Sequence, residues 1–188
     1  MIKKRFYFVR HGRTDWNDRQ LCQGQVDVPL NEAGRLEAAR LAEFLKPVIF
    51  SDIYCSPLIR ALETATIIQQ GIPDRSLHVL DGLKERWWGK CEGSSNRDMY
   101  RIEELEDFEP EVALKMGVEP KNTFKYRVQQ ALDLALKNSE LPLFVSHGRV
   151  FLVLCEILNL PPIKQIPNTS LVECKFSDGF WDLSIIEN

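Results

Sequence analysis

Two histidines stand in the same local setting, and that setting suits chemistry on a bound anion. His11 follows a bulky apolar run at residues 6–9, and His147 follows a second apolar run at residues 142–145, each after one intervening residue. Such runs predict strands that are buried on both faces. In open α/β folds, ligands bind beyond the carboxyl ends of the strands. We therefore expect His11 and His147 to face one common ligand.

Arginines near the ends of neighbouring elements would complete an anion site. Arg10 lies where the first strand leaves the core, an unfavourable place for a charge without a partner. Arg60 falls in the first turns of a helix that we expect to be capped by Ser56, with Pro57 in its first turn. Helix N-termini attract phosphate, and a guanidinium adds a two-pronged clamp. A lone histidine is most often structural, as we infer for His78, so the prediction depends on these residues occurring together.

Alternating strand-like and helix-like segments would hold these residues in place. Short apolar runs predict strands, apolar residues spaced three and four apart predict helices, and Asn31 is the expected cap of the first long helix. This alternation predicts an α/β fold, a three-layer α/β/α sandwich with a mostly parallel central sheet. The expected strands lie at about residues 6–9, 52–55, 78–80, 142–145, 171–176 and 180–186, and the expected helices at about 32–46, 56–69, 128–135 and 150–158.

Residues 94–121 differ from the rest of the chain. They are rich in carboxylates and are interrupted by Pro110, Gly117 and Pro120. We expect a small, partly helical insertion on the surface, with its acidic residues forming a solvated face. The whole chain, residues 1–188, is predicted to be one domain that contains this insertion.

Composition excludes several classes of protein. With 188 residues, of which 44% are apolar and 27% charged, the chain has the balance of a soluble globular domain. A net charge of −3 argues against a nucleic-acid partner. The longest apolar run, at residues 150–155, is far too short to span a membrane, and the apolar stretch near the N-terminus is too short for an export signal. Five cysteines without a CxxC pair predict reduced thiols and a cytoplasmic location.

Further motifs accompany the two histidines in a fixed order along the chain. They are Arg10-His11-Gly12-Arg13-Thr14-Asp15-Trp16-Asn17, Gln23-Gly24 with Asp27-Val28-Pro29-Leu30-Asn31-Glu32-Ala33-Gly34, Ser56-Pro57-Leu58-Ile59-Arg60-Ala61-Leu62-Glu63-Thr64-Ala65, Leu83-Lys84-Glu85-Arg86-Trp87-Trp88-Gly89-Lys90-Cys91-Glu92-Gly93, Val145-Ser146-His147-Gly148 and Asn168-Thr169-Ser170. In this order, over residues 5–175, they resemble the histidine phosphatase superfamily in its phosphoglycerate mutase-like branch.

The resemblance implies a metal-independent phosphomonoesterase with the phosphoglycerate mutase-like fold. His11 would attack phosphorus and form a phosphohistidine that water then hydrolyses, which is nucleophilic catalysis. Arg10, Arg60 and His147 would hold the phosphoryl oxygens, and Asn17 would add a neutral donor. Charge stabilisation of this kind is the main task in phosphoryl transfer. The implied partner is a small-molecule phosphate ester, and no cofactor or metal is implied.

Glu85 matches the position of the proton donor in this branch. It would protonate the leaving oxygen and later deprotonate the attacking water. Taken alone, Glu85 is a surface carboxylate in a charged loop, so its role is carried by the resemblance. The resemblance also implies that Gln23, Gly24 and Gly148 line the substrate site. Gly148 stands where the acid-phosphatase branch has an aspartate donor, which leaves the donor's role to Glu85.

Three alternatives to hydrolysis of a small ester stay open. A cofactor-dependent phosphoglycerate mutase needs extra cations for a bisphosphate, and no adjacent arginine pair occurs among Arg97, Arg101, Lys115 and Lys121. A phosphoprotein phosphatase or a phosphate-binding regulator would keep the same pocket. A metal site built from His11, His147 and Glu85 is disfavoured by the neighbouring cation Arg10.

Two departures from the family pattern are expected to influence the leaving-group pocket or the packing around it. Arg13 stands where the family usually has glutamate, which would add a cation near the pocket mouth. We expect Arg13 to affect substrate preference more than turnover. The consecutive Trp87 and Trp88 are also unusual, and either could line the pocket or pack against its walls.

Overall fold

A six-stranded sheet with the order β3-β2-β4-β1-β5-β6 forms the centre of the computed structural model, which describes residues 4–161 and 166–186. Strands β3, β2, β4 and β1 pair in parallel, β5 pairs antiparallel to β1, and β6 pairs antiparallel to β5. The predicted α/β fold with a mostly parallel sheet is confirmed. The strands are β1 (Phe6–Arg10), β2 (Ile53–Cys55), β3 (Leu77–Val79), β4 (Leu143–Ser146), β5 (Leu171–Ser177) and β6 (Phe180–Ile186).

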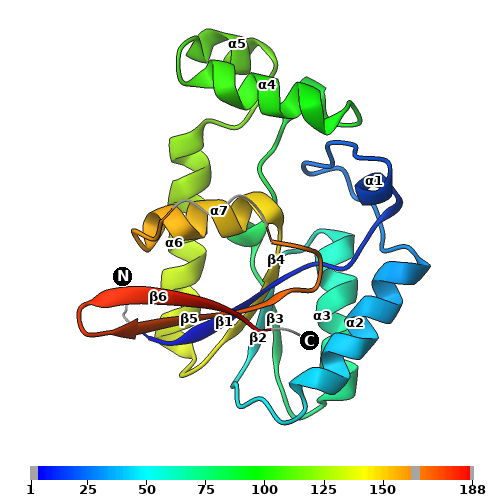
Figure 1. The fold of residues 1–188 in the computed structure, drawn as a ribbon, viewed down its shortest axis with the longest axis vertical. Helices are drawn as coiled ribbons and strands as arrows, with labels where there is room; N and C mark the ends of the chain where they lie inside the picture. The colour runs from blue at the N-terminus through cyan, green and yellow to red at the C-terminus, as the bar shows by residue number, and fades with distance from the viewer. Residues whose placement is uncertain (1–3, 162–165, 187–188) are drawn as a thin grey trace.

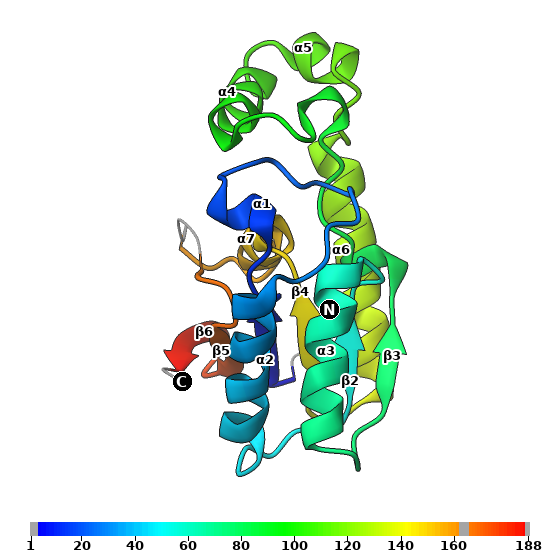
Figure 2. The same cartoon turned by 90° about the vertical axis from the view of Figure 1, so that its right-hand side faces the viewer.

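Helices cover both faces of the sheet. Along β1, Phe6 and Phe8 point into one apolar core, whereas Tyr7 and Val9 point into the other. A strand buried on both sides is therefore apolar throughout and does not alternate with polar residues. Helices α2 (Glu32–Leu45) and α3 (Ile59–Gly71) pack side by side on the face of Tyr7 and Val9, and α6 (Lys121–Asn138) and α7 (Gly148–Ile157) pack on the opposite face (Figure 1, Figure 2).

The starts of two helices show where local signals succeed and where they fail. Helix α2 begins after Asn31, whose side chain accepts a hydrogen bond from the Gly34 amide at 2.9 Å, as predicted. The prediction that Ser56 caps α3 is wrong, because the helix begins at Ile59 and Leu58 is its N-cap. The Ser56 hydroxyl instead accepts from the Leu58 amide and contacts a histidine of the site described below.

Residues 94–121 form two helices that stand away from the sheet. Helix α4 (Asn96–Glu106) and helix α5 (Pro110–Lys115) lie at one end of the molecule, and α6 runs from them back along the sheet (Figure 1). A small apolar cluster joins this α4–α5 segment to the loops below it. The cluster consists of Cys22, Trp88, Cys91, Met99, Ala113 and Val118. The remaining short elements are α1 (Asp15–Asp18) and the 3-10 helices η1 (Asp81–Leu83) and η2 (Gly89–Cys91).

The acidic residues of the α4–α5 segment are not all solvated. Glu106 accepts two hydrogen bonds from the buried Arg86 guanidinium, both of 2.7 Å, and Glu103 forms an ion pair of 2.7 Å with Arg149. The expectation of a solvated acidic face is wrong for these two carboxylates, because each compensates a cation that the fold buries. Other carboxylates of the segment are exposed, namely Glu104, Asp107, Glu109 and Glu111.

All five cysteines are buried and unpaired. Burial raises the pKa of the Cys22 and Cys55 thiols to about 12 and that of Cys155 to about 11. The thiols of Cys91 and Cys174 also have raised pKa values, chiefly because they are buried. Every cysteine therefore packs as a small apolar residue in its thiol form.

Within residues 4–161 and 166–186, no helix combines the length and the apolar character that crossing a membrane requires.

Candidate active site

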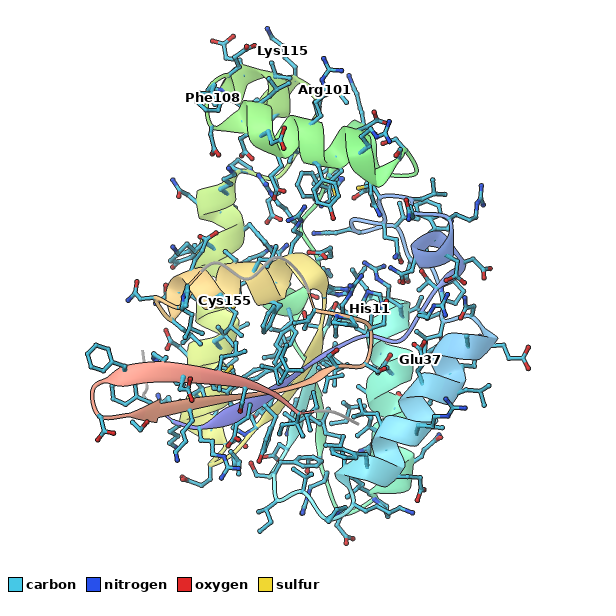
Figure 3. All side chains as sticks on the ribbon, viewed as in Figure 1. His11, Glu37, Arg101, Phe108, Lys115 and Cys155 are labelled. Carbon is cyan, nitrogen blue, oxygen red and sulfur yellow. The ribbon has the colours of Figure 1, made fainter. Side chains whose placement is uncertain are left out.

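A cavity of about 70 Å³ lies beyond the carboxyl ends of β1 and β4, in the region of His11 (Figure 3). Eight of the nine predicted site residues line it, and the ring centroid of the ninth, His147, lies 5.2 Å from that of His11. The lining residues that were predicted are Arg10, His11, Asn17, Gln23, Gly24, Arg60, Glu85 and Gly148. Trp88, for which the sequence left this role open, also lines the cavity, and the residues that were not predicted are Leu21, Asn96, Met99, Tyr100, Arg149 and Leu152.

The backbone and ring of His11 are held by hydrogen bonds from several directions. Its backbone amide donates to the Ser146 carbonyl at 2.9 Å, and Asn168 donates its side-chain amide to the His11 carbonyl at 2.7 Å. Ring nitrogen Nδ1 lies 2.7 Å from the Gly12 carbonyl and must be the protonated nitrogen, because a carbonyl can only accept. This tautomer leaves Nε2 with its lone pair.

Burial and positive neighbours keep both histidines neutral. Burial lowers the pKa of His11 well below its ordinary value, and the charges of Arg60 and Arg10 lower it further. The pKa of His147 is lowered in the same way, first by burial and then by Arg60. The Nε2 atom of His147 lies 2.7 Å from the Ser56 hydroxyl, while its Nδ1 is buried without a hydrogen bond to the described residues. A neutral imidazole with a free lone pair is the form that acts as a nucleophile.

Arg60, which is buried, and Arg10, which is partly buried, bring two positive charges to this cavity. Arg10 donates to the Ile166 carbonyl at 2.8 Å, and Arg60 donates to the carbonyls of Val26 and Gly24 at 2.9 and 2.7 Å. Neither guanidinium forms an ion pair with a carboxylate of the described residues, and the Nε of each is buried without a hydrogen bond there. Burial lowers the pKa of Arg60 to about 10, so it remains charged at neutral pH. Two guanidiniums at one cavity that form no ion pair with a carboxylate of the described residues favour the binding of an anion there.

The carboxylate of Glu85 lies on the cavity wall and is held by backbone amides. Its two oxygens accept from the amides of Arg86 and Arg149, at 2.8 and 3.1 Å. The Glu85 carbonyl accepts from Gln25 at 3.0 Å and from Arg127 at 2.8 Å. Both ends of this residue are therefore fixed, with the carboxylate in the cavity and the main chain anchored behind it.

The predicted polar residues of the first loop support the cavity from another side. The side-chain oxygen of Asn17 accepts from the Thr14 amide at 3.1 Å and lies 3.0 Å from the Thr14 hydroxyl, closing a capping box on α1. Because the oxygen makes this cap, the amino group of Asn17 is not needed for it. Gly24 has a positive φ of 49°, and a Cβ there would lie 2.0 Å from a carboxylate oxygen of Glu92. Gly24 thus allows the turn that brings its carbonyl to Arg60.

The structure corrects the expectation for Arg13. Its side chain is half-exposed, forms an ion pair with Asp18, and does not line the cavity. The reason is local: Asp18, which does not line the cavity either, pairs with the guanidinium. Of the two adjacent tryptophans, the buried Trp88 lines the cavity, whereas the exposed Trp87 does not.

Arg149 is the charged lining residue that the sequence analysis missed. Its guanidinium lies over the rings of Tyr100 and Trp88, at 5.0 and 5.7 Å from their centroids, and is paired with Glu103. Tyr100 and Glu103 come from α4, so these contacts arise only once the α4–α5 segment folds over α7. The position of Arg149 immediately after Gly148 was the one available signal.

No group of three or more His, Cys, Asp or Glu side chains in the described part of the chain is arranged to hold a metal ion.

Comparisons with known proteins identify the family. The histidine phosphatase superfamily (branch 1) matches residues 6–188. The chain belongs to this superfamily, as its motifs predicted.

Relatives cover the domain to different extents. Agropine synthesis reductase of Rhizobium rhizogenes is 33% identical over an alignment of 194 positions, which covers 97% of this chain and 42% of that protein. Probable phosphoglycerate mutase GpmB of Proteus mirabilis is 32% identical over 189 residues, covering 93% of this chain and 86% of that protein. The phosphoserine phosphatase of Entamoeba histolytica, solved in complex with phosphoserine, is 27% identical with a TM-score of 0.78, covering 97% of this chain and 96% of that chain. The chain spans less than half the length of the first curated relatives that it matches.

Proposed function

We propose that the protein is a metal-independent phosphatase that hydrolyses a small phosphorylated metabolite through a phosphohistidine on His11. One observation carries the proposal: a buried neutral histidine, fixed in one tautomer, adjoins two guanidiniums that form no ion pair with a carboxylate of the described residues. Similarity to a phosphoserine phosphatase solved with phosphoserine supports a small phosphate ester as the class of substrate. The small cavity supports it as well, because pockets for larger ligands usually measure about 300–1,000 Å³.

The proposed reaction has two displacements at phosphorus. In the first, Nε2 of His11 attacks phosphorus, the bond to the leaving oxygen breaks, and protonated Glu85 gives that oxygen its proton. In the second, the Glu85 carboxylate takes a proton from water, the water oxygen attacks phosphorus, and the bond to Nε2 breaks to release phosphate. The Nδ1–H bond to the Gly12 carbonyl stabilises the charged phosphoimidazole between the two steps.

The buried cations would stabilise charge during both displacements. Arg10 and Arg60 are assigned to the phosphoryl oxygens, and the unpartnered Nδ1 of His147 adds a third contact. Asn17 supplies a neutral donor at the other side of the cavity. In this proposal the arginines take the place that a metal ion has in other phosphoryl-transfer enzymes.

Hydrolysis is favoured over mutase chemistry by the cations of the α4–α5 segment. Lys115 and Lys121 form ion pairs with Glu111 and Asp107, and none of the segment's four cations lines the cavity. Figure 3 shows Arg101 and Lys115 at the outer end of the segment, away from His11. A bisphosphate would therefore find no second cationic group from this segment. The match to a probable phosphoglycerate mutase makes this a distinction to test.

The first experiment is phosphate release from p-nitrophenyl phosphate in EDTA, with the wild type beside His11→Ala. Activity in EDTA that is lost in the variant is the expected result, and incorporation of labelled phosphate into the wild type alone would identify the phosphoenzyme. Activity that requires an added metal would favour the metal-site alternative. An inactive wild type that becomes phosphorylated by 2,3-bisphosphoglycerate would be a mutase, and one that only binds phosphate would be a regulator.

Glu85 and His147 have separate signatures in the same assay. Glu85→Gln should lower kcat/KM strongly for an alkyl phosphate and little for p-nitrophenyl phosphate, since the acidic phenol leaves without a proton. His147→Ala should lower kcat by about 10²–10³ for both esters, the effect of removing one charge-stabilising donor. Equal losses on both esters in Glu85→Gln would remove Glu85 from the donor role.

The setting of the reaction is also part of the proposal. We propose that small-molecule phosphate esters, not nucleic acid or membranes, are the partners of this domain, because its net charge is −3. A cytoplasmic location is proposed because the five buried cysteines are all unpaired.

A further inference from the structure

We propose that Arg127 of α6 is a positioning residue for Glu85, holding the loop that carries this carboxylate at the distance that proton transfer requires. The inference rests on the proposed role of Glu85 as the proton donor. Arg127 does not line the cavity, so it would act only through the main chain of the loop.

The loop around Glu85 lacks the regular backbone hydrogen bonds of a helix or a strand. Residues 84–88 lie between η1 and η2 and belong to no helix or strand. Backbone carbonyls in such a segment need donors from elsewhere when they are shielded from water. Arg127 supplies them: its Nη1 donates to the carbonyls of Gly82 and Lys84 at 2.9 and 2.7 Å, and its Nη2 donates to the Glu85 carbonyl at 2.8 Å.

The Arg127 side chain is itself fixed in place. Glu119 accepts from Nε at 2.7 Å and from Nη2 at 2.8 Å, and the guanidinium lies over the Phe124 ring, 4.7 Å from its centroid. Together with the three carbonyls, Glu119 brings the number of acceptors to five, and a guanidinium has five N–H donors. A lysine has three donors around one atom and cannot reproduce this fork.

Glu119 also joins the loop through its own main chain. Its amide donates to the Trp87 carbonyl at 2.8 Å, and its carbonyl accepts from the Nε and Nη2 of Arg86, at 2.9 and 2.7 Å. The two residues that follow Glu85 are therefore tied to the segment that leads into α6. Arg127 is the group that unites these contacts, because it bonds to Glu119 and to the Glu85 carbonyl at once.

Proton transfer makes this arrangement matter for the reaction. A general acid must lie within about 2.6–3.2 Å of the leaving oxygen, and displacement by about 1 Å can cost roughly 10²-fold in rate. Loss of Arg127 would remove the side-chain donor of the Gly82 and Lys84 carbonyls and one of the two donors of the Glu85 carbonyl. It would also leave the Glu119 carboxylate without its ion pair. The nucleophile and the two buried arginines sit on other elements and would keep their contacts.

The test is a double-mutant cycle of Arg127→Gln and Glu85→Gln, measured as kcat/KM for glycerol 2-phosphate and p-nitrophenyl phosphate. The parameter kcat/KM reports the first displacement, in which the two esters differ in their need for a proton. We expect Arg127→Gln to lower kcat/KM for the alkyl ester by about tenfold or more and for the aryl ester by less than about threefold. In the Glu85→Gln background, Arg127→Gln should cause no further loss on the alkyl ester.

Controls separate positioning from a general loss of structure. Lys125→Ala removes an exposed cation of the same helix, whose partner is Glu156, and should leave both esters unaffected. Arg127→Lys should show the same selective loss as Arg127→Gln, and it decides the question if the glutamine variant does not fold. Equal losses on the two esters, or a loss that adds fully to that of Glu85→Gln, would overturn the inference.

The same data distinguish failure of the inference from failure of the proposed function. If Glu85→Gln is selective for the alkyl ester but the Arg127 variants are not, Glu85 remains the donor and Arg127 does not position it. If Glu85→Gln itself affects both esters equally, the assigned donor is wrong and the inference falls with it. If the wild type hydrolyses neither ester, the proposed phosphatase function is wrong.

Discussion

Acidification from pH 7.5 to 5.5 should remove about 2.7 kcal/mol of stability through His11 and His147 alone. Both side chains are buried, and burial together with Arg60 lowers the pKa of each well below its ordinary value. The unfolded chain then binds protons that the folded protein does not. Stability from this source is present in full above the unfolded pKa of about 6.5 and is lost as the pH falls toward the folded values.

The magnitude follows from linkage. A histidine that stays neutral in the folded protein, and has a pKa of about 6.5 when unfolded, loses about 1.4 kcal/mol of stabilisation between pH 7.5 and 5.5. His11 and His147 both meet this condition, which doubles the effect. Most carboxylates titrate below this interval, so the histidines dominate within it.

Urea unfolding at pH 7.5, 6.5 and 5.5 measures the effect directly. The buffers must contain no phosphate, because a ligand that binds only the folded state adds stability of its own. His11→Asn and His147→Asn serve as matched variants, since each removes one titrating group. In each single variant, the decrease in unfolding free energy between pH 7.5 and 5.5 should be about half that of the wild type. In the double variant, the unfolding free energy should be nearly independent of pH over this interval.

Two results would refute the reasoning. A loss below about 1 kcal/mol in the wild type would mean that the folded histidines take up protons as readily as the unfolded ones. A loss that is unchanged in both single variants would assign the pH dependence to other groups. In either case His11 would not be held neutral, and the structural basis for its role as the nucleophile would be wrong.

Three further predictions concern the support of His11 and its surroundings. Thr64→Val removes the hydroxyl that accepts from the buried Gly12 amide at 3.0 Å, so urea unfolding should show a loss of about 1–3 kcal/mol; an unchanged midpoint would contradict this. Gly12→Ala would place a Cβ 2.6 Å from the Gly34 carbonyl oxygen, so kcat should fall sharply in a variant with a native circular dichroism spectrum, and wild-type turnover would show that the backbone can yield. Arg13→Ala should leave the ratio of kcat/KM between any two esters unchanged, because Arg13 contacts the exposed Asp18 and not the cavity. An altered ratio would show that Arg13 does influence substrate preference.

Much of the site's position follows from local sequence. The apolar runs before His11 and His147 predict strands buried on both faces, and β1 and β4 are adjacent and parallel, with Arg10 opposite Ser146. Residues just beyond two such strands must lie at the same edge of the sheet. The spacing of apolar residues predicts the helices on either side, so the framework of the site is encoded in short segments.

What could not be predicted depends on contacts between distant segments. Ser56 has the residue type of a helix cap, but its hydroxyl is engaged by His147 and the helix begins later. Arg149 and Tyr100 meet only because α4 folds over α7. In the sequence, Arg127 has the appearance of an ordinary polar residue of an amphipathic helix. Its five acceptors lie on Glu119 and on the carbonyls of residues 82, 84 and 85, which only the fold brings close to it.

The reactivity of the buried cysteines can report local and global unfolding of this protein. A thiol reacts with alkylating reagents as the thiolate, and burial both shields these five sulfurs and raises their pKa values. Labelling should therefore be slow in the folded state and should proceed through local or global unfolding. Cys22 and Cys91 sit in the small cluster beneath the α4–α5 segment, whereas Cys55, Cys155 and Cys174 sit in the two cores of the sheet. Mass spectrometry of a labelling time course would thus time the release of the segment separately from unfolding of the sheet, without any engineered probe.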